Sequence, residues 1–231
     1  MTRTDRLAIN VAGSSTVSGV LVTPREPRAL FVIAHGAGAG MDHPFLVAVA
    51  TGLGERQVAT LRYQFPYMEA GSKRPDRPPV AQATVRAAVE TAAGLLPGVA
   101  LLAGGKSFGA RMATQTQADR PLPGVVGLVA FGFPLHPAAK PSEERARHLA
   151  DISIPMLFLQ GDRDALADTG LLVPAIERLG QRATLHLLAG ADHSFHVLAR
   201  SGRTDAEVMS ETLDAMLDWL SRRVGPSVDA R

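Results

Sequence analysis

The chain has 231 residues, 46% of them hydrophobic, which is enough for one well-filled core without a split into two domains. Lys and Arg number 24 against 22 Asp and Glu, and no basic stripe with interleaved aromatics occurs, which argues against nucleic-acid binding. The lack of cysteine excludes disulfides, thiolate metal sites and a cysteine nucleophile. We therefore expect one domain over residues 1–231.

The first ten residues mix Arg3, Asp5 and Arg6 with polar groups and contain no apolar stretch of the length that a signal peptide needs. No run of the chain approaches the ~20 apolar residues of a membrane-spanning helix. We expect a cytoplasmic protein that does not bind membranes.

Two short apolar runs, at residues 18–23 and 29–34, are typical of strands. The second has the continuous apolar character of a strand covered on both faces, and it ends in a glycine-rich loop at residues 35–40. Helical spacing follows at residues 44–55, and residues 58–63 predict another buried strand. Together these elements predict a β-α-β unit.

The middle of the chain continues this alternation. Residues 64–79 contain four prolines and predict a loop, and residues 80–96 predict an Ala-rich helix that is closed by Pro97 and Gly98. The next strand, at residues 99–103, runs through a short glycine-containing turn directly into a helix at residues 110–118.

Three further strands are predicted at residues 125–131, 156–160 and 183–188, before a final helix at residues 205–222. Strands that alternate with helices indicate an α/β fold, with a mostly parallel sheet and helices on both faces. Such sheets carry their sites at the carboxyl ends of the strands. Because the segment 132–151 is short, we expect no large cap domain.

The turn after the strand at residues 99–103 carries the candidate nucleophile. Gly105-Lys106-Ser107-Phe108-Gly109 matches G-x-S-x-G, the nucleophile elbow, in which a sharp strand-to-helix turn projects the serine hydroxyl above the sheet. Side chains at the two glycine positions would collide with the neighbouring strand and helix. A serine at a helix start is otherwise an N-cap, and the surrounding elements favour the elbow.

A serine hydroxyl needs a base, and the base needs an acid that fixes its tautomer. His193 follows the strand at residues 183–188 in a short loop and is the preferred base, with His196 as the alternative. Asp162 and Asp164 both follow a buried strand in the chain order Ser, Asp, His that this fold requires. We prefer Asp164, because the residue three past the glycine of a G-x-x-D turn can reach the histidine loop.

An oxyanion hole is expected from two backbone amides, those of Phe108, after the nucleophile, and of Ala37, in the glycine-rich loop. His35 is expected to organise that loop. The loop lacks both G-x-G-x-x-G and the Lys and Ser/Thr of a P-loop, so nucleotide binding is disfavoured. No metal and no organic cofactor is implied.

Five stretches together resemble the α/β-hydrolase family that is related to dienelactone hydrolases, in its testis-expressed-protein-thirty and NSL-complex-subunit-three group. These stretches are residues 35–45, 62–71, 104–111, 160–164 and 192–195. The resemblance implies Ser107, Asp164 and His193 as the catalytic triad. The stretch 62–71 departs from a generic hydrolase pattern and suggests that Met41, Tyr63 and Tyr67 contact substrate, with loop packing as the alternative.

Two functions follow. The first is an esterase-like serine hydrolase that cleaves an acyl bond of a small molecule, and Lys106 and Arg111 beside the elbow suggest an anionic substrate. The second is a non-catalytic interaction protein that keeps the fold, since some relatives in the group are subunits of larger assemblies. The sequence determines neither the bond type nor the oligomeric state.

Overall fold

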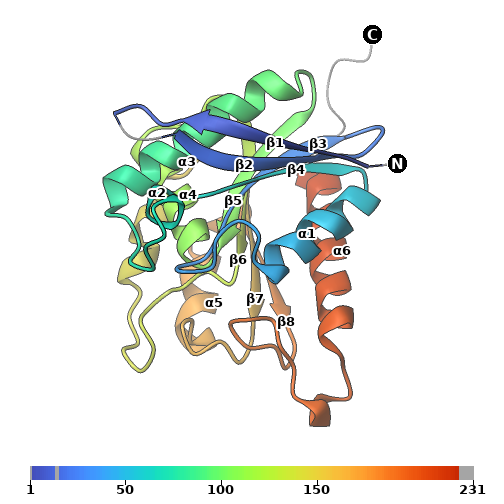
Figure 1. Cartoon of the computed structure of the whole chain (residues 1–231). Coiled ribbons are helices and arrows are strands. Elements are labelled where there is room, and N and C mark those ends of the chain that lie inside the picture. The colour runs from blue at the N-terminus through green and yellow to red at the C-terminus, as the bar shows by residue number, and fades with distance from the viewer. Residues whose placement is uncertain (1, 14–15, 224–231) are drawn as a thin grey trace.

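The computed structural model describes residues 2–13 and 16–223, and these build one eight-stranded sheet (Figure 1). Its spatial order is β1-β2-β4-β3-β5-β6-β7-β8; β2 is antiparallel to β1 and β4, and the pairs from β4 to β8 are parallel. The strands are β1 (Arg3–Asn10), β2 (Thr16–Thr23), β3 (Ala29–Ala34), β4 (Val58–Tyr63), β5 (Ala100–Lys106), β6 (Val125–Phe131), β7 (Met156–Gly161) and β8 (Ala183–Leu188).

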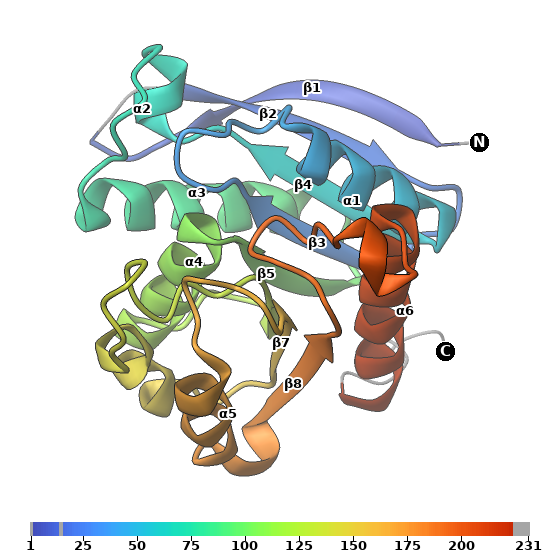
Figure 2. The ribbon, with the colours of Figure 1, turned by 90° about the horizontal axis from the view of Figure 1, so that it is seen from below.

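Helices cover both faces of the sheet, with α1 and α6 on one side and α3, α4 and α5 on the other (Figure 2). The α-helices are α1 (Pro44–Glu55), α2 (Pro66–Glu69), α3 (Pro78–Leu95), α4 (Phe108–Asp119), α5 (Thr169–Glu177) and α6 (Asp205–Arg223). The 3-10 helices are η1 (Glu144–Asp151), η2 (Gly180–Arg182) and η3 (Ala199–Ser201). The prediction of an α/β sheet without a large cap is confirmed for the described residues.

Strand β3 explains why the sheet needs cover on both faces, because all six of its residues are buried. Leu30, Val32 and Ala34 belong to the core layer beneath α3, α4 and α5. Phe31 and Ile33 point the other way, into the layer beneath α1 and α6. Successive side chains of a strand alternate between faces, so a strand covered on both sides is apolar throughout.

Strand β1 was not predicted, and its position explains the omission. It is an edge strand in which most residues are exposed or partly exposed, and only Ile9 is buried. Its charged residues suit an edge but hide the strand from a search for apolar runs. The expected loop at 64–79 also contains α2 and the start of α3, and the segment 132–151 contains η1.

No helix within the described ranges is long and apolar enough to cross a membrane. The parallel strands from β3 to β8 end at one edge of the sheet, and the loops that follow β3, β5, β7 and β8 meet there. This edge holds the side chains that the sequence singled out.

Candidate active site

The turn from β5 into α4 has the geometry of a nucleophile elbow. Ser107 lies at φ 51° and ψ −111°, a strained conformation for a residue with a side chain, and its amide donates to the Phe131 carbonyl at 3.0 Å. A Cβ at Gly105 or at Gly109 would lie 2.5 Å from the Ala34 carbonyl oxygen, so neither position accepts a side chain. The Ser107 hydroxyl makes no capping bond to α4, which leaves it available to another partner.

That partner is His193, in the loop that follows β8. The distance between His193 Nε2 and Ser107 Oγ is 2.9 Å, and His193 Nδ1 lies 2.6 Å from Asp164 Oδ2. The histidine side chain is 26% exposed, whereas that of Asp164 is fully buried. The three side chains form one continuous hydrogen-bonded chain from the interior to the surface, which we call the Ser107–His193–Asp164 triad.

The surroundings of Asp164 keep its carboxyl group ionised. Burial alone would raise its pKa, but the hydrogen bonds from His193 and the Leu166 amide, with the charge of Lys106, outweigh burial and lower the pKa. Leu166 N donates to Oδ1 at 2.7 Å and Gln160 Nε2 donates to Oδ2 at 2.6 Å. Because an ionised carboxylate only accepts, His193 Nδ1 carries the proton and Nε2 accepts from the serine hydroxyl.

Gln160 is a contributor that the sequence reasoning missed. It is a fully buried polar residue at the end of the apolar strand β7. A buried polar side chain in such a run needs a partner, which is the signal that could have singled it out.

The two alternative residues lie apart from this chain of hydrogen bonds. Asp162 accepts from the Gly190 amide at 2.8 Å and so ties together the loops after β7 and β8. His196 is exposed, and its Nδ1 pairs with Asp205 at 2.9 Å, near the start of α6. Of the candidates weighed for base and acid, the structure therefore brings His193 and Asp164 to Ser107.

The loop after β3 lies beside the serine. A Cβ built on Gly36 would be 3.8 Å from the Ser107 Cβ, so the backbone of this loop borders the nucleophile. Among the described residues, the amides of Ala37 and Phe108 have no hydrogen-bond acceptor. Two unpaired donors at the amino end of α4 and in the adjoining loop are the groups that a developing oxyanion requires.

His35 holds this loop in place. Its Nδ1 donates to the Gly36 carbonyl at 2.7 Å, and its Nε2 accepts from the Phe65 amide at 3.1 Å. Burial lowers its pKa to about 4, so the ring is neutral at physiological pH. The expectation that His35 organises the loop agrees with these contacts.

The three residues proposed to contact substrate are packed into the protein instead. Tyr63 is 1% exposed and lies in the main core, and burial raises the pKa of its hydroxyl. Met41 packs in a small apolar cluster that it shares with Val20 and Val22. Tyr67 is 5% exposed, and its hydroxyl accepts from the Gly38 amide at 2.9 Å. Of the three side chains, Tyr67 contacts the glycine-rich loop, and the burial of all three favours a packing role over contact with substrate.

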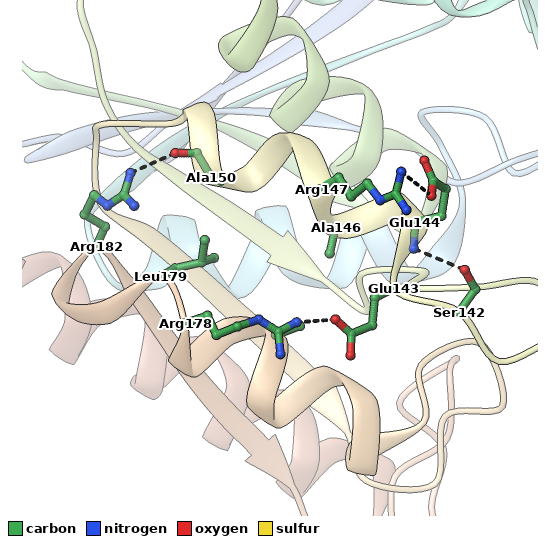
Figure 3. A pocket seen from close by; sticks show the side chains of 10 residues that line it. Ser142, Glu143, Glu144, Ala146, Arg147, Ala150, Arg178, Leu179 and Arg182 are labelled. Atoms are coloured by element: carbon green, nitrogen blue, oxygen red, sulfur yellow. Dashed lines mark hydrogen bonds and ion pairs between the residues drawn. The ribbon is translucent and has the colours of Figure 1, made fainter.

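A groove of about 480 Å³ lies elsewhere, between η1 and α5 (Figure 3). None of the triad residues lines it. Its charged side chains pair with one another or with the backbone: Arg178 with Glu143, Arg147 with Glu144, and Arg182 with the Ala150 carbonyl. Within the described part of the chain, no group of three or more His, Asp and Glu side chains could hold a metal ion.

The comparisons with known proteins agree with this geometry. Residues 27–221 match the family model described as an alpha/beta hydrolase domain. A parallel sheet with a strained serine elbow defines the class of α/β hydrolases. The chain belongs to the alpha/beta hydrolase domain family.

Solved structures share the fold over nearly their whole length. A serine hydrolase without a lid from Xanthomonas campestris has a TM-score of 0.74 at 19% identity, and the match covers 94% of this chain and 95% of that one. A dienelactone hydrolase from Anabaena variabilis also has a TM-score of 0.74 at 19% identity, covering 96% and 98%. The esterase domain of a Rhodothermus marinus protein has a TM-score of 0.73 at 15% identity, covering 96% and 100%. At these identities the likeness establishes the fold.

Proposed function

We propose that the protein is a serine hydrolase that cleaves an ester-type acyl bond of a small molecule. The observation that carries the proposal is the unbroken hydrogen-bonded chain from Ser107 through His193 to the buried Asp164, beside two unpaired backbone amides. The finer resemblance, to the testis-expressed-protein-thirty and NSL-complex-subunit-three group, stays a prediction.

In the acylation step, His193 Nε2 takes the proton of the Ser107 hydroxyl as Oγ attacks the substrate carbonyl carbon. The carbonyl oxygen becomes an oxyanion that accepts hydrogen bonds from the Ala37 and Phe108 amides. Asp164 stabilises the resulting imidazolium. His193 then gives its proton to the leaving alkoxide, and the carbon–oxygen bond breaks to leave an acyl group on Ser107.

Water reverses this sequence in the deacylation step. His193 takes a proton from the water molecule as its oxygen attacks the acyl carbon, and the same two amides hold the second oxyanion. The bond to Ser107 Oγ breaks, and His193 returns the proton to the serine. The side chains of this chain supply every proton transfer, so the proposed cycle needs no cofactor.

Arg111 bears on the choice of substrate. It lies one helical turn after Ser107, and its Nε is buried without a hydrogen-bond partner among the described residues. Burial lowers its pKa, and the nearby charge of Arg145 lowers it further. Two neighbouring guanidinium groups favour a carboxylate or another anion between them. We therefore keep the proposal of an anionic acyl substrate for Arg111 and withdraw it for Lys106, which is buried and points to another partner.

The test is covalent labelling with a fluorophosphonate, compared between the wild type and Ser107→Ala. We expect Ser107 Oγ of the wild type to attack the phosphorus of the probe and displace fluoride, which leaves the serine phosphonylated and the protein labelled. The variant should remain unlabelled, with an unchanged circular dichroism spectrum and melting temperature. Absence of labelling in a folded wild type would overturn the proposal. That outcome, together with a protein that co-purifies stoichiometrically with both forms, would favour the alternative of a non-catalytic interaction protein.

A further inference from the structure

Lys106 is a buried cation for which the proposed reaction has no use. It is the residue before the nucleophile, and only 8% of its surface is exposed. Its ammonium lies 5.6 Å from the ring centroid of Phe45 and 5.3 Å from that of Phe195. A Cβ on Gly132 would lie 2.8 Å from Nζ, so the glycine that directly follows β6 leaves the space that the ammonium occupies.

The ammonium links the end of β5 to the loop after β8. Lys106 Nζ donates to the backbone carbonyl of His193 at 2.5 Å. Lys106 is the last residue of β5, and Ser107 follows it directly. The contact therefore forms a second link between the serine and the histidine, through the main chain and independent of the bond between Nε2 and Oγ.

The surroundings of the Lys106 ammonium make its charged form less stable than it would be in water. Burial lowers the pKa of Lys106 to about 8, against the opposing effects of Asp164 and Asp192. From the side of α1, the ring of Phe45 faces the ammonium; from the loop after β8, Asp192, the His193 carbonyl and the Phe195 ring face it. Among the described residues the ammonium has one hydrogen bond, so its burial destabilises the folded state, and an apolar side chain of similar length would destabilise it less.

We propose that Lys106 is a positioning residue whose ammonium holds the His193 loop against the end of β5 and so fixes the imidazole at hydrogen-bonding distance from Ser107. The inference rests on the proposed function. It assigns a role to the variable position of the elbow motif, which the motif itself does not specify. The aromatic rings complete the binding site for the ammonium, since they attract a desolvated cation while they exclude water.

The first test compares Lys106→Met with Lys140→Met, which removes an exposed lysine. For Lys106→Met we expect the rate of fluorophosphonate labelling and kcat to fall by about 10- to 100-fold with little change in KM, because a displacement of ~1 Å can cost about 100-fold. The control should retain wild-type rates. The melting temperature of Lys106→Met at pH 7 should equal or exceed that of the wild type, because a buried charge is lost. A lowered melting temperature with unchanged rates would make Lys106 a stability residue and overturn the proposal.

The lack of cysteine allows a rescue experiment. Lys106→Cys carries the only thiol of the chain, and in the unfolded state its thiolate can displace bromide from 2-bromoethylamine to give a thioether analogue of lysine. After refolding, we expect this analogue to regain most of the labelling rate. The matched control, alkylation with 1-bromopropane, gives a side chain of the same length without the charge and should stay slow. Equal rates for the two adducts would overturn the proposal.

The pH dependence of the labelling rate distinguishes a role of the Lys106 charge from a role of its side chain in packing. In the wild type we expect labelling to decline above about pH 8 as the ammonium loses its proton. The thioether analogue should decline at lower pH, because its sulfur makes the amine less basic, and Lys106→Met should lack this step. The same alkaline decline in Lys106→Met would contradict the proposal.

A measurement without activity keeps this proposal separate from the proposed function. Amide hydrogen exchange in the loop after β8 should accelerate in Lys106→Met and not in Lys140→Met. If the wild type is never labelled, the proposed function fails while the exchange result still decides whether Lys106 holds the loop. If the wild type is labelled and Lys106→Met matches it in rate and exchange, the Lys106 proposal alone fails.

Discussion

Two histidines follow strands at the same edge of the sheet, and their environments differ in every respect that matters for proton transfer. His35 is 0% exposed, and both ring nitrogens bind backbone groups. His193 is partly exposed and lies between a carboxylate and a hydroxyl. Among the described residues, no carboxylate lies close enough to His35 to offset the burial of a charge on its ring, whereas a charge on His193 would face Asp164.

The comparison shows that the hydrogen-bond partners of a histidine, more than its proximity to the serine, allow it to act as a base. A base must hold a proton temporarily, so it needs a group that stabilises its charged form and a second nitrogen that is free to accept. His35 has neither a charge-stabilising group nor a free nitrogen. Its neutral ring holds the loop that presents the Ala37 amide.

The largest expected effect comes from removing the base. His193→Ala should lower kcat by about a million-fold, the order of loss found when a triad histidine is removed. His35→Gln, the matched variant, should keep labelling within about tenfold, because it disturbs only the geometry of an oxyanion donor. The measurement is single-turnover acylation of both variants beside the wild type. Equal losses of acylation rate in the two variants would contradict the different roles assigned to His193 and His35.

Replacing the acid should make His193 resemble His35. In Asp164→Asn the neutral amide can donate to Nδ1, which favours the wrong tautomer, and kcat should fall by about 10⁴-fold. Asp162→Asn, two residues earlier in the chain, serves as the control and should affect kcat little. A larger loss in Asp162→Asn than in Asp164→Asn would reverse the assignment of the acid.

The lowered pKa of His35 should make the free energy of unfolding depend on pH in the acidic range. Its pKa in the protein is about 4, below the ordinary value of 6.5, so between these values the unfolded chain binds a proton that the folded protein does not. The free energy of unfolding should therefore drop as pH falls from 6.5 to 4, by about 3 kcal/mol from this group. Urea titrations across this range should show a shallower pH dependence for His35→Gln. Parallel curves for the two proteins would refute the assignment.

The smallest expected effect concerns the two cations beside the elbow, which repeat the contrast between a bound and a free group. Lys106 binds the His193 carbonyl, whereas the Arg111 side chain has no hydrogen bond or ion pair among the described residues. Arg111→Gln should lower kcat/KM by about tenfold for an ester that carries a carboxylate, the equivalent of one charge-assisted hydrogen bond. A neutral ester of equal size should be unaffected. Equal effects on both esters would remove the anionic substrate from the proposal.

The order of elements and the place of the nucleophile could be predicted from the sequence, because both depend on local physics. Strand β3 is apolar throughout since both its faces are covered, and the prediction of an α/β fold is confirmed. The turn at Ser107 allows no side chain at Gly105 or Gly109, so the constraint is visible in the residues themselves. Strand β1 was not predicted, because an exposed edge strand requires neither an apolar sequence nor glycines at fixed positions.

Only the tertiary structure decided which side chains meet. Asp162 and Asp164 stand two residues apart after the same strand, and the pairing of β7 with β8 brings Asp164 to His193 and Asp162 to the Gly190 amide. Tyr63 follows an ordinary strand pattern, and its burial depends on elements distant in the chain. Local sequence fixes the conformation of a turn, whereas the direction of a long side chain such as Lys106 depends on the space and the acceptor that other strands provide.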